Sequence, residues 1–484
     1  MLDWLDSRTG LITQAQNFLK EDVPGGASYW YVFGSATLFA MIIQIVTGIF
    51  LTFFYAPSAA TAWESTRAIY ANPFQHFVLS MHYWGSSAMI ALVFLHLLQV
   101  LIWGAYKSPR EIQWIVGVLL LIVTLVLGFT GYLLPWDMNA YFASQVALNM
   151  ASSAPVAGPL IQHILQGGAV MGTATINRFF GLHVWLMPAM LVLLVGAHLA
   201  ILRHNGPAGP AVDDPRPLKK GRFYPDQVFM DTVVSFGVFI VILLLAWFAP
   251  PFLDAKANPN VFFIPYPAWY FLSLFGLLNL VPHQFDLFAT IVIPTAFIII
   301  LFAVPWLDRS ISRTTGSRKG MMWGTAVVVA AVIGLSIFSQ VSIMGKQAAA
   351  AQLAPPPPVA STSTSSSASS ATVASTSSSP GARVFSQSCS ACHGATGMGQ
   401  PGAIPPLANN PFVTGPANAV IGVVLNGLHG AITVNGRSYN SMMPTWKGNL
   451  TNKQIAEVIT YIRGSLGKNK ASAVTTAQVA AHKP

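Results

Sequence analysis

Seven long apolar stretches constrain this chain more than any other feature of its sequence. Each is at least 20 residues long, and at about 1.5 Å of helix per residue this is enough to cross a hydrocarbon core roughly 30 Å thick. Because charged residues make up only 8% of the 484 residues, the sequence predicts an integral, all-α membrane protein. The stretches are residues 32–55, 77–103, 115–134, 179–202, 229–248, 287–307 and 321–341.

Basic residues are distributed unevenly among the segments between these stretches. Alternate loops, with the N-terminal segment, hold 13 Lys and Arg residues, whereas the remaining loops hold three, Arg67, Arg178 and Lys256. Since Lys and Arg stay preferentially on the cytoplasmic side, we expect the N-terminus inside and, after seven crossings, the C-terminus outside. The net charge of +10 is scattered rather than gathered on one face, which argues against nucleic-acid binding.

Composition divides the chain into five parts. Residues 1–30 resemble an amphipathic surface segment, 31–205 hold four crossings and 206–346 hold three. Residues 347–381 are almost entirely Ala, Pro, Ser and Thr, a composition that cannot bury enough apolar surface to fold, so we expect a disordered linker there. Residues 382–484 then form a separate small domain.

Four histidines lie inside the apolar stretches with matched spacings. His82 and His96 are 14 residues apart on the second stretch, and His183 and His198 are 15 apart on the fourth. These spacings fall about 40° short of, and about 60° past, four full helical turns, so each pair shares roughly one face at two depths. With both helices entering from the outside, His82 faces His183 and His96 faces His198. Facing imidazoles are the axial ligands of a six-coordinate haem, although single membrane histidines are often hydrogen-bonding or proton-relay groups instead.

Four glycines repeat the histidine spacing. Gly34 and Gly48 on the first stretch, and Gly117 and Gly131 on the third, are also 14 residues apart. A missing side chain at haem depth would let a flat macrocycle approach the helix backbone. The alternative is close packing of helices through small residues, which is common in membranes.

Residues 20–307 resemble cytochrome b of quinol:cytochrome c oxidoreductases. The resemblance is carried by GYLLPWDMNAYFA, GGAVMGTATINRFFGLHVWLMP and PAWYFL. The 15-residue histidine spacing and the seven crossings are similar to the chloroplast-type branch, there split into two subunits. The resemblance implies a four-helix di-haem bundle and an inner quinone-reduction site that includes Arg203 and Asp231. We also count Arg178 among the cofactor-binding residues. An alternative for Arg203 is a loop charge that reaches the lipid headgroups.

The same resemblance places an outer quinol-oxidation site at Pro267, Trp269 and Tyr270. The family signature there is Pro-Glu-Trp-Tyr, but Ala268 replaces the glutamate. Quinol oxidation releases protons, so the site needs a hydrogen-bond and proton acceptor that Ala268 cannot provide. The candidates are Tyr270, His283, Asp286, ordered water or a partner residue, and we favour His283 for its near-neutral pKa. A plain interfacial anchor is an equally good interpretation of His283.

The C-terminal domain contains a c-type haem attachment motif. Cys389 and Cys392 would bind the porphyrin vinyl groups, and His393 would be the proximal iron ligand. A thioredoxin-like pair or half of a zinc site is less consistent with this setting. Residues 381–468 resemble a small class I cytochrome c, which implies Met443 as the distal ligand, with Met442 and Met398 as competitors. Because c-type haem is attached outside the cytoplasmic membrane in bacteria, this motif agrees with the predicted topology and with a bacterial cytoplasmic membrane protein.

These features together predict a cytochrome b subunit of a bc-type complex. The expected cofactors are two b-type haems and one c-type haem, with quinol and quinone as substrates. The expected partners are a Rieske-type iron-sulfur subunit, other cytochrome c subunits or a terminal oxidase, membrane lipid and a second copy in a homodimer. The alternatives are a quinone-reactive cytochrome b that does not split electron pairs, consistent with Ala268, and a membrane anchor and electron conduit for another redox enzyme.

Overall fold

A computed structural model describes most of the chain. The described residues are 2–168, 170–211, 220–259, 263–353, 379–389, 393–394, 396–399, 404–428, 430, 432–439, 443, 445–447 and 450–482. They divide into two compact units, which we describe separately. The membrane unit consists of Met1–Ala257 and Ile264–Ala354, and the C-terminal unit of Asn258–Phe263 and Pro355–Pro484.

Seven helices in the described part of the chain are long and apolar enough to cross a membrane. They agree with the seven predicted stretches and confirm the predicted fold class. Three of them contain a π-helical turn, at η2 (Leu182–Leu186), η3 (Phe223–Gln227) and η6 (Phe288–Val292). The crossings are α3 (Val32–Thr52), α5 (Pro73–Trp103), α6 (Glu111–Tyr132), α9 (Thr173–Gly181) with η2 and α10 (Met187–Asn205), η3 with α11 (Val228–Phe248), η6 with α13 (Ile293–Leu307), and η7 (Gly316–Arg318) with α14 (Lys319–Leu353).

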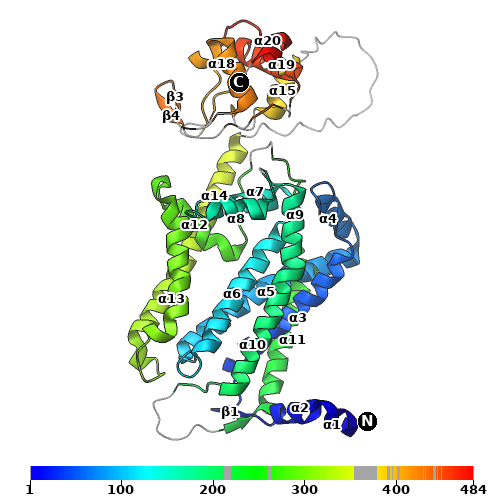
Figure 1. Ribbon diagram of the computed structural model, residues 1–484, viewed down its shortest axis with the longest axis vertical. Helices are drawn as coiled ribbons and strands as arrows, with labels where there is room; N and C mark the ends of the chain where they lie inside the picture. The colour runs from blue at the N-terminus through cyan, green and yellow to red at the C-terminus, as the bar shows by residue number, and fades with distance from the viewer. Residues whose placement is uncertain are drawn as a thin grey trace, which may run out of the picture. The chain divides into compact units, whose positions relative to one another are not determined.

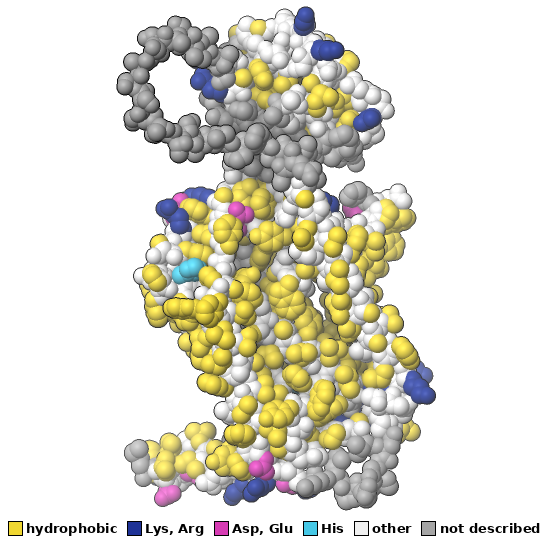
Figure 2. Space-filling model, turned by 180° about the vertical axis from the view of Figure 1, so that it is seen from behind, with side chains coloured by type: hydrophobic (Ala, Val, Ile, Leu, Met, Phe, Trp, Pro, Cys, Tyr) yellow, Lys and Arg dark blue, Asp and Glu magenta, His cyan; other side chains and the backbone are white. Residues whose placement is uncertain are grey.

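The first four crossings form a bundle in which α3 packs on α5 and α6 on α10 (Figure 1). Helix α11 lies against α3 and α5, α13 lies against α6, and the short helix α12 (Leu272–Leu280) packs on α14. Ala36 and Ala40 are fully buried, and their small side chains allow close approach of the helices. Hydrophobic side chains cover much of the face of the bundle seen in Figure 2, as expected where lipid replaces water.

The two ends of the bundle carry different short elements (Figure 1). One end holds α4 (Ala62–Ala71), α7 (Met138–Ser152) and α8 (Gly158–Gln166). The other end holds α1 (Leu2–Thr9), α2 (Leu11–Leu19) and an antiparallel pair of β1 (Asp22–Pro24) with β2 (Lys220–Arg222). Three short 3-10 turns complete the unit, η1 (Tyr29–Tyr31), η4 (Trp269–Phe271) and η5 (His283–Phe285).

A buried guanidinium joins the first four helices to the last three. Arg318 is only 2% exposed, and its Nη1 donates to the carbonyl of Leu101 at 3.0 Å while its Nη2 donates to that of Ile102. These carbonyls lie in the last turn of α5, where the regular i+4 amide donors of the helix end. Gly104 ends α5 with φ of +58°, and a Cβ there would lie 3.1 Å from the Arg318 guanidinium carbon. The position therefore needs glycine for both its backbone conformation and this contact.

The C-terminal unit is a small helical domain. Its described elements are α15 (Pro380–Ser388), α17 (Pro411–Thr414), α18 (Ala417–Asn426), α19 (Asn452–Gly464), α20 (Thr476–Ala481) and a hairpin of β3 (Ile432–Val434) and β4 (Arg437–Tyr439). Thr451 caps α19 and forms a capping box with Gln454, which confirms the predicted start of this helix. The predicted apolar face is also confirmed, because Ile455, Val458, Ile459 and Ile462 are all buried. The hairpin is an addition that the sequence did not suggest.

The ends of the predicted linker differ from the structure. Helix α14 continues to Leu353, so the first seven residues of the 347–381 segment are helical, and α15 already begins at Pro380. The run of alanines at 348–351 explains the longer helix, because alanine has the highest helix propensity. Residues 354–378 of the linker lie outside the described part of the chain.

Candidate functional site

The four membrane histidines lie in the two expected pairs. The ring centres of His82 and His183 are 6.2 Å apart with the planes at 80°. Those of His96 and His198 are 6.5 Å apart with the planes at 78°. His82 and His96 come from α5, whereas His183 lies in η2 and His198 in α10.

Both separations fit an iron atom held between the rings. A metal–nitrogen bond of about 2 Å on each side, with roughly 1.2 Å from each nitrogen to its ring centre, would separate two imidazole centres by about 6.4 Å. The observed values of 6.2 and 6.5 Å bracket this distance. The separations of the two imidazole pairs therefore fit an iron atom held between each pair.

A π-helical turn reconciles the two unequal histidine spacings. His183 lies within η2 (Leu182–Leu186), so the 15 residues between His183 and His198 include one wide turn. A π turn takes up one more residue than an α turn. The rotation between this pair is therefore close to that of 14 α-helical residues, the spacing of His82 and His96. The sequence alone could not place this turn.

Hydrogen bonds at Nδ1 orient three of the four rings. Thr47 Oγ1 lies 2.9 Å from His82 Nδ1. The carbonyl of Leu127 lies 3.1 Å from His183 Nδ1, and Gln99 Oε1 lies 3.1 Å from His96 Nδ1. A proton held on Nδ1 leaves Nε2 with the lone pair that a metal needs. Sequence reasoning missed Thr47, which lies on the neighbouring helix α3, and Gln99, which lies three residues after His96 on α5 and could have been found from that spacing.

Each of the four glycines lies opposite one of the histidines. A Cβ on Gly48 would approach His82 Cε1 to 3.2 Å, and one on Gly131 would approach His183 Cε1 to 2.5 Å. At the other depth, Cβ atoms on Gly34 and Gly117 would lie 3.4 and 3.5 Å from His96 Cε1 and His198 Cε1. The glycines thus form the walls against which the imidazoles rest, which supports their assignment to the cofactor sites.

The residues expected at the inner quinone site bind neighbours from the β1 and η3 region. Arg203 on α10 forms a salt bridge with Glu21. Asp231 on α11 accepts from Gln227 Nε2 at 2.9 Å, and Gln227 Oε1 in turn accepts from the Ser28 amide at 2.9 Å. Sequence reasoning missed Glu21, which lies 182 residues before Arg203 and has no local signal, and Gln227, which lies four residues before Asp231 and could have been found from that spacing.

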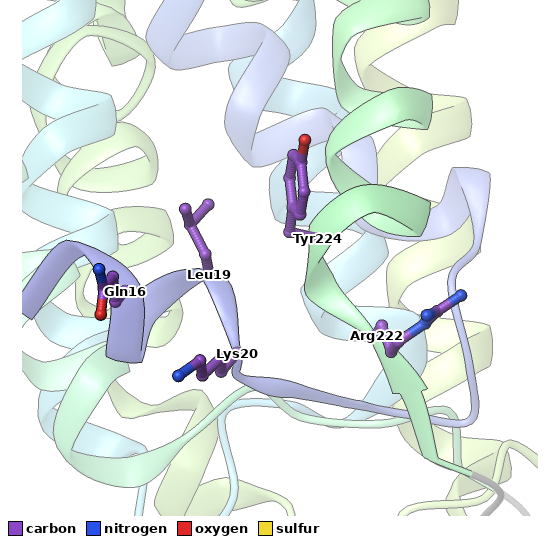
Figure 3. Close-up of a pocket in the computed structure, with 5 residues that line it drawn as sticks. All are labelled: Gln16, Leu19, Lys20, Arg222 and Tyr224. Atoms are coloured by element: carbon purple, nitrogen blue, oxygen red, sulfur yellow. The ribbon is translucent and has the colours of Figure 1, made fainter.

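A small cavity opens beside this region (Figure 3). It has a volume of about 360 Å³. Its lining joins the end of α2 to the β2 and η3 segment, through Gln16, Leu19, Lys20, Arg222 and Tyr224. Leu19 and Tyr224 give it apolar surface, whereas Lys20 and Arg222 place positive charge at its edge (Figure 3).

The outer loop places Pro267, Trp269 and Tyr270 at the start of η4. Pro267 is buried, and Trp269 Nε1 lies 3.4 Å from Ser87 Oγ on α5. Tyr270 reaches α6, where a Cβ on Gly128 would lie 2.9 Å from its hydroxyl. His283 belongs to η5, but its side chain lies outside the described part of the chain, so the structure does not place it.

Arg178 lies on α9 and binds the neighbouring helix. Its Nη1 donates to the carbonyls of His163 and Ile164 in the last turn of α8. The described contacts of Arg178 are therefore those of a cation that caps a helix C-terminus.

A polar network behind the outer loop was not anticipated from the sequence. Tyr132 donates to the carbonyl of Tyr266 at 2.8 Å and accepts from Asn139 Nδ2. The Tyr266 amide donates to Asn139 Oδ1 at 2.9 Å. Asp137, two residues before Asn139, is 8% exposed and caps α7. The network ties the end of α6 and the start of α7 to the strand of chain that precedes Trp269.

In the C-terminal unit, His393 is 8% exposed and its Nδ1 lies 3.0 Å from the carbonyl of Pro405. Burial lowers the pKa of His393, which favours the neutral, metal-binding form. Met443 packs against the buried core and pairs with Leu428 in a short antiparallel bridge. Cys389 is half-buried against the same core, whereas Cys392 and Met442 lie outside the described residues.

Paired imidazoles inside a multi-pass bundle, together with a c-type attachment motif on a small helical domain, define the class of membrane-bound electron-transfer cytochromes. Family models agree with each part. The model described as "Cytochrome b(N-terminal)/b6/petB" matches residues 87–264, "Cytochrome b(C-terminal)/b6/petD" matches 256–355, and "Cytochrome c" matches 378–465. The chain belongs to the cytochrome b family and carries a fused cytochrome c domain.

Individual relatives support this assignment. The chain is 42% identical over 219 residues to the "Menaquinol:cytochrome c reductase cytochrome b subunit" of Geobacillus thermodenitrificans, covering 43% of this chain and 98% of that protein. It is 32% identical over 363 residues to "Cytochrome b" of Allochromatium vinosum, covering 69% and 87%. A solved "Hyperthermophilic respiratory Complex III" superposes with a TM-score of 0.61 at 27% identity, covering 70% of this chain and 91% of that one. These matches confirm the expected class, a cytochrome b subunit of a quinol:cytochrome c oxidoreductase, with haems of the b and c types.

Proposed function

We propose that this chain oxidises quinol at the outer loop near Trp269 and Tyr270 and reduces quinone at the inner end near Arg203 and Asp231. The observation that carries the proposal is the distance between the ring centres of each histidine pair. It is 6.2 Å for one pair and 6.5 Å for the other, at two depths of one bundle, and both values suit an iron atom between the rings. When bound, two b-type haems would supply one-electron carriers at these depths. His82 and His183 would hold the outer one, and His96 and His198 the inner one.

The chain's own residues divide the remaining work. At the outer loop, the indole of Trp269 and the phenol of Tyr270 would form the walls of the quinol pocket, and protons would leave to the outer aqueous phase. At the inner end, Arg203 would attract the developing negative charge of a reduced quinone and Asp231 would hand on a proton from the cytoplasm. Gly34, Gly48, Gly117 and Gly131 would keep the space in which the haem ligands rest.

The fused domain would carry the first electron of each quinol onward. Cys389, Cys392, His393 and Met443 would hold one c-type haem, and a Rieske-type iron-sulfur subunit would pass it the first electron from quinol. Two of the most similar relatives, from Geobacillus thermodenitrificans and Bacillus subtilis, are named as subunits of a menaquinol:cytochrome c reductase. We therefore propose menaquinol as the substrate, and other cytochrome c subunits or a terminal oxidase as the next acceptor in a dimeric complex.

The proposed location is the bacterial cytoplasmic membrane, with the N-terminus inside and the cytochrome c domain outside. The excess of Lys and Arg in alternate loops supports this orientation. We propose residues 31–205 as the di-haem domain, 206–346 as the second membrane domain and 382–484 as the cytochrome c domain, with 1–30 lying on the membrane surface.

Redox spectroscopy of the purified complex tests the proposal. We expect two non-covalent haems for each covalent haem, and menaquinol should reduce the c-type haem. Adding an oxidant together with menaquinol should cause extra reduction of the b-type haems, because one electron of each pair is forced into the bundle. A ratio of one to one, or no menaquinol oxidation by a complex with full haem content, would refute the assignment.

Ala268 favours one second candidate, a quinone-reactive cytochrome b that does not split electron pairs. In that case menaquinol would still be oxidised, but oxidant would not drive extra reduction of the b-type haems. The same experiment therefore separates the two functions.

A further inference from the structure

The outer loop lacks the carboxylate of the family's Pro-Glu-Trp-Tyr signature. Ala268 stands in place of the signature glutamate, and there is no Asp or Glu between Lys256 and Pro282. Proton acceptance at this loop then falls to another group, and a carboxylate from another segment of the chain would meet the need. Of the described carboxylates at this end of the bundle, Glu64 is exposed and paired with Arg67 and Lys256, which suits a surface role rather than a buried one.

Asp137 differs from Glu64 in burial and in position. Its side chain is 8% exposed, and its Oδ1 accepts from the Ala140 amide at 2.8 Å. The second oxygen, Oδ2, accepts from the Asp254 amide at a long 3.3 Å. A hydrogen bond of this length holds the oxygen weakly, so Oδ2 keeps the capacity to take a proton. Backbone bonds with Ala255 and Ala257 fix this segment against the α6–α7 turn.

Asp137 is connected to the quinol loop by the polar network described above. Asn139, in the first turn of the helix that Asp137 caps, bonds both the Tyr132 hydroxyl and the Tyr266 amide. The charge of Asp137 acts on Tyr132, Tyr266 and Tyr70. Tyr132 is in turn electrostatically coupled to Tyr270, which lines the proposed pocket. The Asp137 carboxylate and the Tyr132 hydroxyl thus lie on either side of Asn139, and ordered water would complete a proton path between them.

We propose that Asp137 replaces the missing glutamate as the proton-relay residue of outer quinol oxidation. The proposal rests on the quinol-oxidising function proposed above. The O–H bond of the quinol breaks as its electron passes to the iron-sulfur partner, and the proton moves through the Tyr132 hydroxyl and ordered water to the Asp137 carboxylate. Asp254 takes it next and releases it to the outer water, which leaves Asp137 ionised for the next turnover.

The surroundings of Asp137 suit a group that exchanges protons. Burial, and to a smaller extent the negative charge of Asp254, raises the pKa of Asp137 above its ordinary value, against the hydrogen bonds from backbone amides. The groups that face it are Asp254, the phenols of Tyr132, Tyr266 and Tyr70, and the backbone of Lys256, which forms a β-bridge with Asp137. A raised pKa brings a carboxyl closer to the range in which it accepts and returns protons during turnover.

The substitution Asp137→Asn separates a relay from a helix cap. Asparagine caps helices about as well as aspartate, so α7 should keep its start, but an amide accepts no proton. We expect menaquinol oxidation to fall by about 10- to 100-fold. The rise of rate with pH that reflects ionisation of Asp137 should disappear, whereas a purely structural role would leave the pH profile unchanged. Adding Ala268→Glu to this variant should restore most of the rate.

Controls make the outcomes distinct. Glu64→Gln removes a carboxylate at the same end of the bundle without touching the network, and it should keep the rate and the pH profile. A wild-type complex that does not oxidise menaquinol would refute the proposed function itself. A wild-type complex that is active, with Asp137→Asn matching it in rate and pH profile, would overturn the relay alone. Failure of Ala268→Glu to raise the rate of an Asp137→Asn complex with normal haem content would also count against the relay.

Discussion

Gly131 offers the sharpest test of the close contact between the four glycines and the four membrane histidines. In Gly131→Ala the new Cβ would lie 2.5 Å from His183 Cε1, whereas carbon atoms in contact are normally about 3.5 Å apart. The imidazole must therefore move by roughly 1 Å, which is half the length of a metal–nitrogen bond of about 2 Å. We expect the outer b-type haem to lose its low-spin, six-coordinate form, and the non-covalent haem content to fall from two towards one per covalent haem.

Haem quantification with low-temperature redox spectra and electron paramagnetic resonance would measure this loss. The inner haem, held by His96 and His198, serves as an internal control for folding. Gly117→Ala is the matched variant, because its Cβ would lie 3.5 Å from His198 Cε1, an ordinary contact, and it should keep far more of its haem. Two full low-spin signals in Gly131→Ala would refute the reasoning.

Three further predictions concern the two units separately. Burial alone would raise the pKa of Asp308, but hydrogen bonds from Tyr106 and Lys107 outweigh burial and lower that pKa. Asp308→Asn should therefore lower the unfolding free energy by about 3 kcal/mol at pH 7. The wild-type advantage should vanish as pH falls below the ordinary value of 3.8, which thermal unfolding across pH would show. Met443→Leu should lower the c-type haem potential by on the order of 0.1 V in a redox titration, and Met442→Leu should not. Arg463 donates to two carbonyls at 2.8 Å, so Arg463→Met should lower the unfolding free energy of the cytochrome c domain by about 2–4 kcal/mol. The c-type spectrum should then be lost at a lower temperature, and the b-type bands should not change.

Patterns that repeat along the chain were readable from the sequence. Hydropathy located all seven crossings, because a lipid environment demands an unbroken apolar helix, although α14 continues to Leu353, well past the predicted end at residue 341. The facing of His82 with His183 followed from helical rotation and alternate crossing direction. The capping box at Thr451 and the apolar face of α19 followed from local signals that need no tertiary context.

Features that depend on contacts between distant segments were not readable. The π turn around His183 was not predicted, so the 15-residue spacing left an offset of about 60° between the two histidines. Salt bridges such as Glu21 with Arg203 join segments 182 residues apart, and nothing local marks them. Asp137 was not singled out from the sequence, because its link to the quinol loop runs through the contacts of Asn139 with Tyr132 and Tyr266.

The hydrogen bonds from Arg318 to the end of α5 bear on whether such a protein can be made as two separate polypeptides. The guanidinium belongs to the three-helix half, yet the carbonyls that it satisfies belong to the four-helix half, so the halves hold each other without help from the peptide that connects them. A version expressed as two polypeptides, broken between α10 and α11, should therefore reassemble in the membrane, and the loss of Arg318 should matter far more to the split protein than to the fused one.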